Sequence, residues 1–149
     1  MLDKFTSWVK ETATNLKTEV SKYKNKTFLE ATVAGCALVA AADGNISSEE
    51  KQKMVGFMRQ SDALSVFDIS EVIALFEKYA ATFDFDPMIG KGECPKVIGK
   101  LKKDTGASRM LIRVCCAIGA ADGNFDDDEK AVVREICAEL GLNPADFSL

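Results

Sequence analysis

The sequence of 149 residues predicts an all-α protein, a single-domain bundle of six or seven helices. Apolar residues recur at three- and four-residue steps over most of the chain, which is the spacing of amphipathic helices. No convincing run of alternating polar and apolar residues appears, and no strong hairpin dipeptide separates β-branched segments. The composition, 47% hydrophobic and 28% charged, is that of an ordinary globular domain.

The first predicted helix covers residues 2–23 and has lysines on the back of an apolar stripe. We therefore expect an N-terminal amphipathic helix within residues 1–26, followed by a helical domain at 27–149. This helix either packs on the bundle, the favoured interpretation, or lies on anionic lipid. Its stripe consists of Leu2, Phe5, Val9, Leu16, Val20 and Tyr23.

The remaining helices follow from apolar spacing and from residues that begin or end a helix. The segment 27–42 is apolar nearly all round, which indicates a helix buried in the centre of the bundle. Gly90, Gly92 and Pro95 predict that the helix beginning near Pro87 is irregular or broken. The other helices are expected after a cap at Ser47, at 69–82, at 106–121 and at 127–140, with a short last turn at 143–144.

One turn sequence occurs in two similar copies, "AADGNISSEEK" at 41–51 and "AADGNFDDDEK" at 120–130, which are 79 positions apart. Extending the same register outward relates apolar residues over two whole helical hairpins, at about 31–58 and 110–137. We call these segments the first and the second hairpin. We expect them to pack about a pseudo-two-fold axis.

The repeated turn matches the second half of an EF-hand calcium loop, with glycine at loop position 6 and glutamate at position 12. The first half does not match, because positions 1 and 3 fall on apolar residues in both copies, so a complete EF-hand is not expected. Helix capping explains most of the identities by itself. The exceptions are Asp43 and Asp122, whose carboxylates are unfavourable near helix C-termini.

A bound cation would make those two carboxylates favourable. If the hairpins meet, Asp43, Glu50, Asp122 and Glu129 form one candidate metal site of carboxylate oxygens, suited to calcium, magnesium or manganese. The residues alone place turn capping slightly ahead of metal binding, and both interpretations stay open.

Other residues exclude several chemistries. The chain has no histidine, so Ser/His/Asp and Cys/His catalysis and the usual zinc enzymes are excluded, and no enzyme is predicted. Five cysteines without a CxxC pair or a secretory signal favour a reducing cytoplasm. Cys36, Cys115 and Cys137 are expected in the core, and only Cys94, near two lysines, comes close to a reactive thiol.

The net charge of −4 is unevenly distributed. Residues 1–26 and 91–113 carry excess lysine and arginine, whereas residues 120–149 carry eight acids against two basic residues. This pattern fits an acidic pole that attracts cations and basic strips that meet phosphate or acidic partners, or simply scattered solvated charge. No nucleic-acid partner is expected.

From about residue 20 onward the chain resembles the TerB family of bacterial tellurite-resistance proteins. The resemblance rests on "YKNKTF" at 23–28, "DGNISSEEKQKMVGFMR" at 43–59, "VFD" with "EVI" at 66–73, "FDFD" with "IGKGE" at 83–93 and "ADGNFDDDEK" at 121–130. It implies an all-helical cytoplasmic protein that takes part in stress response. The implied partners are other tellurite-resistance components, above all a membrane protein of the TerC type.

The residues and the resemblance together predict a non-enzymatic binding or scaffold module with an acidic, cation-responsive face. Its expected place is the cytoplasm, with peripheral contact at the inner face of the membrane left open. The alternative is thiol chemistry, in which cysteine thiolates trap or reduce tellurite.

Overall fold

The computed structural model describes the whole chain except residues 1–3, 14, 45, 122 and 124, and it omits the side chain of Ala13. The described residues form eight α-helices and three short 3₁₀ helices, and they contain no strand, so the predicted all-α class is confirmed. The elements are α1 (Lys4–Ala13), α2 (Leu16–Val20), η1 (Ser21–Tyr23), α3 (Lys26–Ala40), α4 (Ser48–Gln60), η2 (Leu64–Val66), α5 (Ile69–Phe85), α6 (Pro87–Gly99), α7 (Thr105–Gly119), α8 (Asp127–Leu140) and η3 (Pro144–Phe147).

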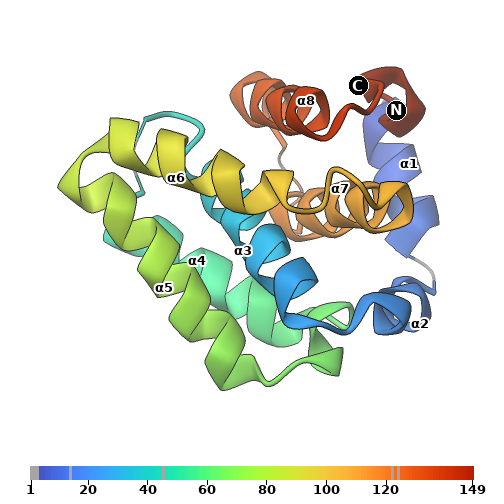
Figure 1. Ribbon diagram of the computed structural model, residues 1–149, viewed down its shortest axis with the longest axis horizontal. Helices are drawn as coiled ribbons and strands as arrows, with labels where there is room; N and C mark the ends of the chain where they lie inside the picture. The colour runs from blue at the N-terminus through green and yellow to red at the C-terminus, as the bar shows by residue number, and fades with distance from the viewer. Residues whose placement is uncertain (1–3, 14, 45, 122, 124) are drawn as a thin grey trace.

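Helix α3 is the centre of the molecule, as its apolar composition predicts. It contacts α4, α5, α6, α7 and α8, with the α5–α6 pair on one side and α7 on the other (Figure 1). Ten of its fifteen residues are buried. Removing large apolar side chains from water contributes about 1.5–3 kcal/mol each, so this helix organises the core.

The number of helices was predicted too low, because the segment 2–23 is not one helix. Asn15 has φ 68°, a left-handed conformation that stops the α-helical path between α1 and α2. Asparagine is one of the few residues besides glycine that adopt this conformation readily. The break turns the expected single helix into α1, α2 and η1.

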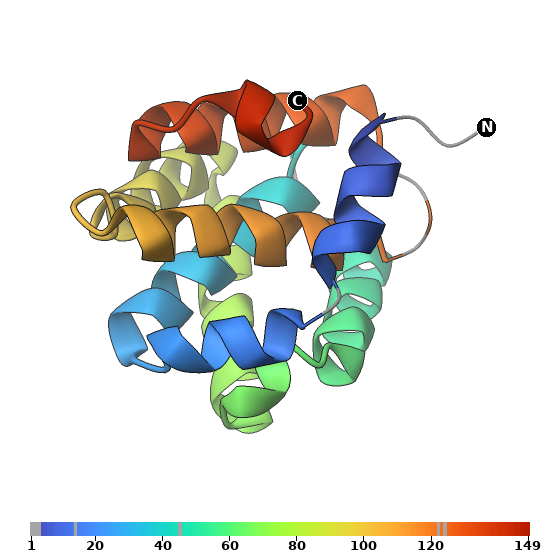
Figure 2. The same ribbon diagram turned by 90° about the vertical axis from the view of Figure 1, so that its right-hand side faces the viewer.

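The N-terminal helix packs on the bundle, as the favoured interpretation predicted. Phe5 and Val9 are buried, and α1 crosses the end of α7 (Figure 2). The Phe5 ring lies 4.7 Å from that of Phe125, and Trp8 meets Phe147 edge-on. The apolar stripe of α1 is therefore used inside the molecule.

The prediction of an irregular helix after Pro87 was wrong, since α6 is continuous from Pro87 to Gly99 with Pro95 inside it. Gly90 is needed for packing, because a Cβ there would lie 2.6 Å from the Phe83 ring. Proline costs a helix one backbone hydrogen bond, and the contacts of α6 with α3, α5 and α8 offset that loss.

None of the described helices is both long enough and apolar enough to cross a membrane.

Candidate functional site

The α3–α4 turn and the α7–α8 turn meet around one surface cavity of about 240 Å³, which we call the turn cavity. Its apolar base comes from the ends of α3 and α7 and from α4. Its polar lining consists of five carboxylates and one ammonium group. The polar residues are Asp43, Glu50, Lys53, Asp126, Asp128 and Glu129.

Each turn is built by the capping chemistry that the sequence predicts. Gly44 and Gly123 have φ of 117° and 80°, conformations that favour glycine. In the first hairpin, Ser47 caps α4 by accepting a hydrogen bond from the Glu50 backbone N–H at 3.1 Å. In the second, Asp126 and Glu129 form a complete capping box on α8. Capping therefore operates in both copies.

Three of the four predicted metal ligands line the turn cavity. Asp43 and Glu50 reach it from the first hairpin and Glu129 from the second. Asp122 lies outside the residues that the structure describes. Glu50 and Glu129, which are 79 positions apart, thus line one cavity, and their role as metal ligands stays a prediction.

The described carboxylates line the same cavity but are not close enough together to hold one metal ion as they stand. Among the described residues, no group of three or more acidic or thiol side chains is arranged closely enough to hold a metal ion. The Glu129 carboxylate accepts a hydrogen bond from the Asp126 backbone N–H at 3.1 Å, and Glu50 accepts one from the Ser47 hydroxyl at the same distance. A cation at this site would require side-chain rotation, which is open to Asp43 and Asp128 because they are exposed, whereas Asp126 would have to give up its cap on α8.

Lys53 was not expected in the site. It follows Glu50 by three positions on α4 and therefore shares a helical face with it, which is the signal in the sequence that could have located it. Its ammonium group brings a positive charge to the cavity. A metal ion would have to share the carboxylates with this lysine.

The side-chain atoms of the cavity that could bind a metal ion are carboxylate oxygens, since the Lys53 ammonium group has no lone pair to donate. Carboxylate oxygens suit hard divalent cations, and calcium tolerates irregular geometry better than magnesium does. The residues present therefore fit calcium, magnesium or manganese by chemistry.

The cysteines do not form a reactive site. All five are buried. For Cys94, burial and the neighbouring Glu93 raise the pKa of the thiol to about 12, so this residue lacks the lowered pKa and exposure of a reactive cysteine. The expectation that Cys94 comes close to a reactive thiol was wrong, because α6 packs it inward.

Cys36 and Cys115 occupy equivalent positions of the two hairpins, and their sulfur atoms lie 4.0 Å apart. The hydrogen bond between the two thiols is the largest cause that raises the pKa of Cys115, and burial is the next. A contact between equivalent residues is what a pseudo-two-fold axis predicts, although the axis itself stays a prediction. The predicted core positions of Cys36, Cys115 and Cys137 are confirmed.

Comparison with known proteins agrees with the resemblance seen in the sequence. A family model described as "Tellurite resistance protein TerB" matches residues 29–149. A protein from an Alcaligenes species, named "Tellurium resistance protein TerB", is 52% identical over 99 residues, which cover 66% of this chain and 81% of that protein. No solved structure matches the chain significantly.

Proposed function

Because the chain belongs to the TerB family of tellurite-resistance proteins, we propose that it is a non-enzymatic binding module whose turn cavity takes a divalent cation. We propose further that it works beside the membrane with a partner of the TerC type and other tellurite-resistance components. The observation that carries the cation site is the meeting of Asp43, Glu50 and Glu129 around one cavity, from turns far apart in the sequence.

The electrostatics of the cavity support a bound cation. Five carboxylates stand against one ammonium group, so the cavity carries a negative potential. Asp43 lies three residues beyond the end of α3, near the partial negative charge of the helix C-terminus. A divalent ion would change each of these repulsions into an attraction.

A cation in the turn cavity would also join the two hairpins. Glu50 lies in the first turn of α4 and Glu129 in the first turn of α8, so one ion held by both would tie the first hairpin to the second. Any ion that binds the folded state alone raises the free energy of unfolding. The module would then be more rigid when loaded, which gives a partner two states to distinguish.

The test is calorimetric titration of chelator-stripped protein with calcium, magnesium, manganese and zinc. We expect heat with at least one hard cation and its loss in Asp43→Asn and in Asp122→Asn. Asp62→Asn is the matched control, because Asp62 is an exposed aspartate in the turn after α4, away from the cavity. In a strain that lacks the gene for this protein and receives a variant in its place, Asp43→Asn should lower tellurite tolerance relative to the parent sequence, whereas Asp62→Asn should not.

Identical heats in parent, Asp43→Asn and Asp122→Asn would remove the cation from the proposal and leave both turns as capping structures.

The thiol alternative has no structural observation in its favour. Its nucleophile would be a thiolate, and burial raises the pKa of Cys94 and of Cys137, to about 12 and about 11. At neutral pH these thiols stay protonated and shielded.

A further inference from the structure

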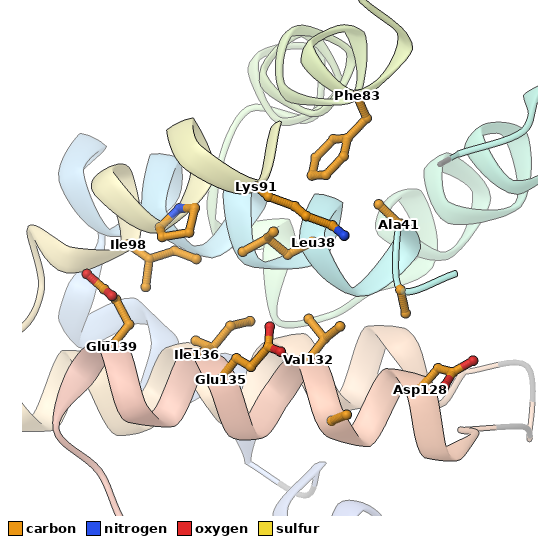
Figure 3. Close-up of a pocket in the computed structure, with 13 residues that line it drawn as sticks. Leu38, Ala41, Phe83, Lys91, Ile98, Asp128, Val132, Glu135, Ile136 and Glu139 are labelled. Carbon is orange, nitrogen blue, oxygen red and sulfur yellow. The ribbon is translucent and has the colours of Figure 1, made fainter. Parts of the chain in front are cut away.

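A second hollow, which adjoins the turn cavity and shares Ala42 and Asp128 with it, lies between α6 and α8 and has a volume of about 370 Å³ (Figure 3). We call it the α6–α8 groove. Its floor comes from the end of α3, and most of its lining is apolar. The apolar side chains are Leu38, Ala41, Ala42, Phe83, Pro95, Ile98, Ala131, Val132 and Ile136.

One wall of the groove carries an acidic row. Asp128, Glu135 and Glu139 lie at positions i, i+7 and i+11 of α8, which places them on one helical face. The row is about 16 Å long at the rise of an α-helix. All three side chains are exposed, and none forms an ion pair with any residue that the structure describes.

The opposite wall is a mostly apolar stripe, interrupted by Lys91, that extends beyond the hollow. Lys91, Pro95 and Ile98 line the groove from α6, and Met88 continues their stripe one turn earlier. Met88 is 78% exposed, although it is apolar. The stripe from Met88 to Ile98 is about 15 Å long, which nearly equals the acidic row.

The groove closes at one end and opens at the other. A Cβ at Gly99 would lie 3.1 Å from Glu139 Oε1, so α6 and α8 are close there. Figure 3 shows Lys91 and Asp128 farther along, where the two helices stand apart. An occupant could therefore enter from the Met88 end.

We propose that the α6–α8 groove binds a basic amphipathic helix of a protein partner. The three carboxylates of the acidic row outnumber Lys91, the one basic side chain among the described residues that line the groove, so they select a cationic occupant. The apolar floor requires apolar side chains beside the positive charges of that occupant. Two walls, each about three helical turns long, suit a helix laid in a groove better than a small molecule. This inference goes beyond the cation site and does not depend on it.

The probe is a fluorescein-labelled peptide of leucine and lysine, patterned as an amphipathic helix about five turns long. Fluorescence anisotropy is measured with chelator present, so that the turn cavity holds no metal. A peptide of the same composition in scrambled order and one with every lysine replaced by glutamate serve as controls. We expect the patterned cationic peptide to bind more tightly than both.

Two pairs of variants locate the binding. Ala131→Trp fills the groove and should abolish binding, whereas Ala138→Trp, on the same helix outside the groove, should not. Glu135→Gln with Glu139→Gln should weaken binding about fivefold or more. The matched control removes two exposed carboxylates from α5, Glu71→Gln with Glu77→Gln.

The proposal is overturned if the parent binds patterned and scrambled peptides equally, or if Ala131→Trp and Ala138→Trp behave alike while circular dichroism shows both folded. Spermidine is added to the complex of parent and peptide as a competitor. If it does not displace the labelled peptide, the result supports a helix as the occupant of the groove. If the parent protein binds spermidine in the groove but does not bind the peptide, the proposal is overturned, and the occupant would be a small cation and not a helix.

Discussion

Residue by residue, the two turns differ at a pair of positions that compensate each other. The second hairpin has Gly119 and Phe125 where the first has Ala40 and Ile46. A Cβ on Gly119 would lie 2.6 Å from Phe125 Cε2, so the larger ring requires the smaller neighbour. Phe125 in turn packs on Phe5 of α1, which the first turn has no need to hold.

This pairing predicts that the effect of Gly119→Ala on the free energy of unfolding depends on the residue at position 125. Gly119→Ala should lower the free energy of unfolding by about 1–3 kcal/mol, because the added methyl group overpacks the site. In a Phe125→Ile background the same substitution should be neutral or stabilising, because alanine favours the helix. Urea denaturation of the four proteins measures the effect. Equal losses in both backgrounds would show that the ring is not the obstacle.

Among the helices, α6 shows how packing overrides local propensity. Gly90 and Gly92 look equivalent in the sequence, yet Gly90 is buried against the Phe83 ring and Gly92 faces open space. Gly90→Ala should lower the free energy of unfolding by about 1–3 kcal/mol through that clash. Gly92→Ala should raise it by up to about 1 kcal/mol through helix propensity.

Thermal unfolding of both variants checks this prediction, with Gly56→Ala in α4 as a further control, because a Cβ at this half-buried glycine would meet no neighbour. A Gly90→Ala protein that melts at the same temperature as Gly92→Ala, or above it, would contradict the close packing of α5 on α6.

A comparison of α8 with α6 and with the break at Asn15 shows which parts of the fold the sequence could predict and which it could not. The bounds predicted for α8, residues 127–140, agree with the structure, because the cap at Asp126 is a strong local signal. The continuity of α6 depends on Phe83 of another helix, and the break at Asn15 depends on a backbone conformation that many asparagines do not adopt. Neither fact is encoded in local spacing.

The candidate site divides in the same way. The repeat in the sequence indicated Asp43, Glu50 and Glu129, because they occupy corresponding places in the two copies of the turn, and all three line one cavity. Lys53 was not predicted, because an ammonium group is not a metal ligand and the metal-site hypothesis concerned oxygen ligands alone. The α6–α8 groove was invisible in the sequence, since its walls come from helices that only the tertiary fold brings together.

Over the whole molecule, the turn cavity and the α6–α8 groove are neighbours that share Ala42 and Asp128. If both proposals hold, a divalent ion in the turn cavity lowers the negative potential along the acidic row. It should therefore weaken binding of the basic peptide, by about two- to fourfold at moderate ionic strength. Because such coupling is reciprocal, the peptide should weaken cation binding by the same factor.

The coupling is measured by repeating the anisotropy titration with millimolar calcium in place of chelator, at constant ionic strength. Asp43→Asn separates coupling from ordinary screening, because this variant keeps the groove intact but should no longer hold the ion. We expect calcium to weaken peptide binding in the parent and to have no effect in Asp43→Asn. Equal weakening in both would mean that calcium acts directly on the acidic row, and the two sites would then be independent.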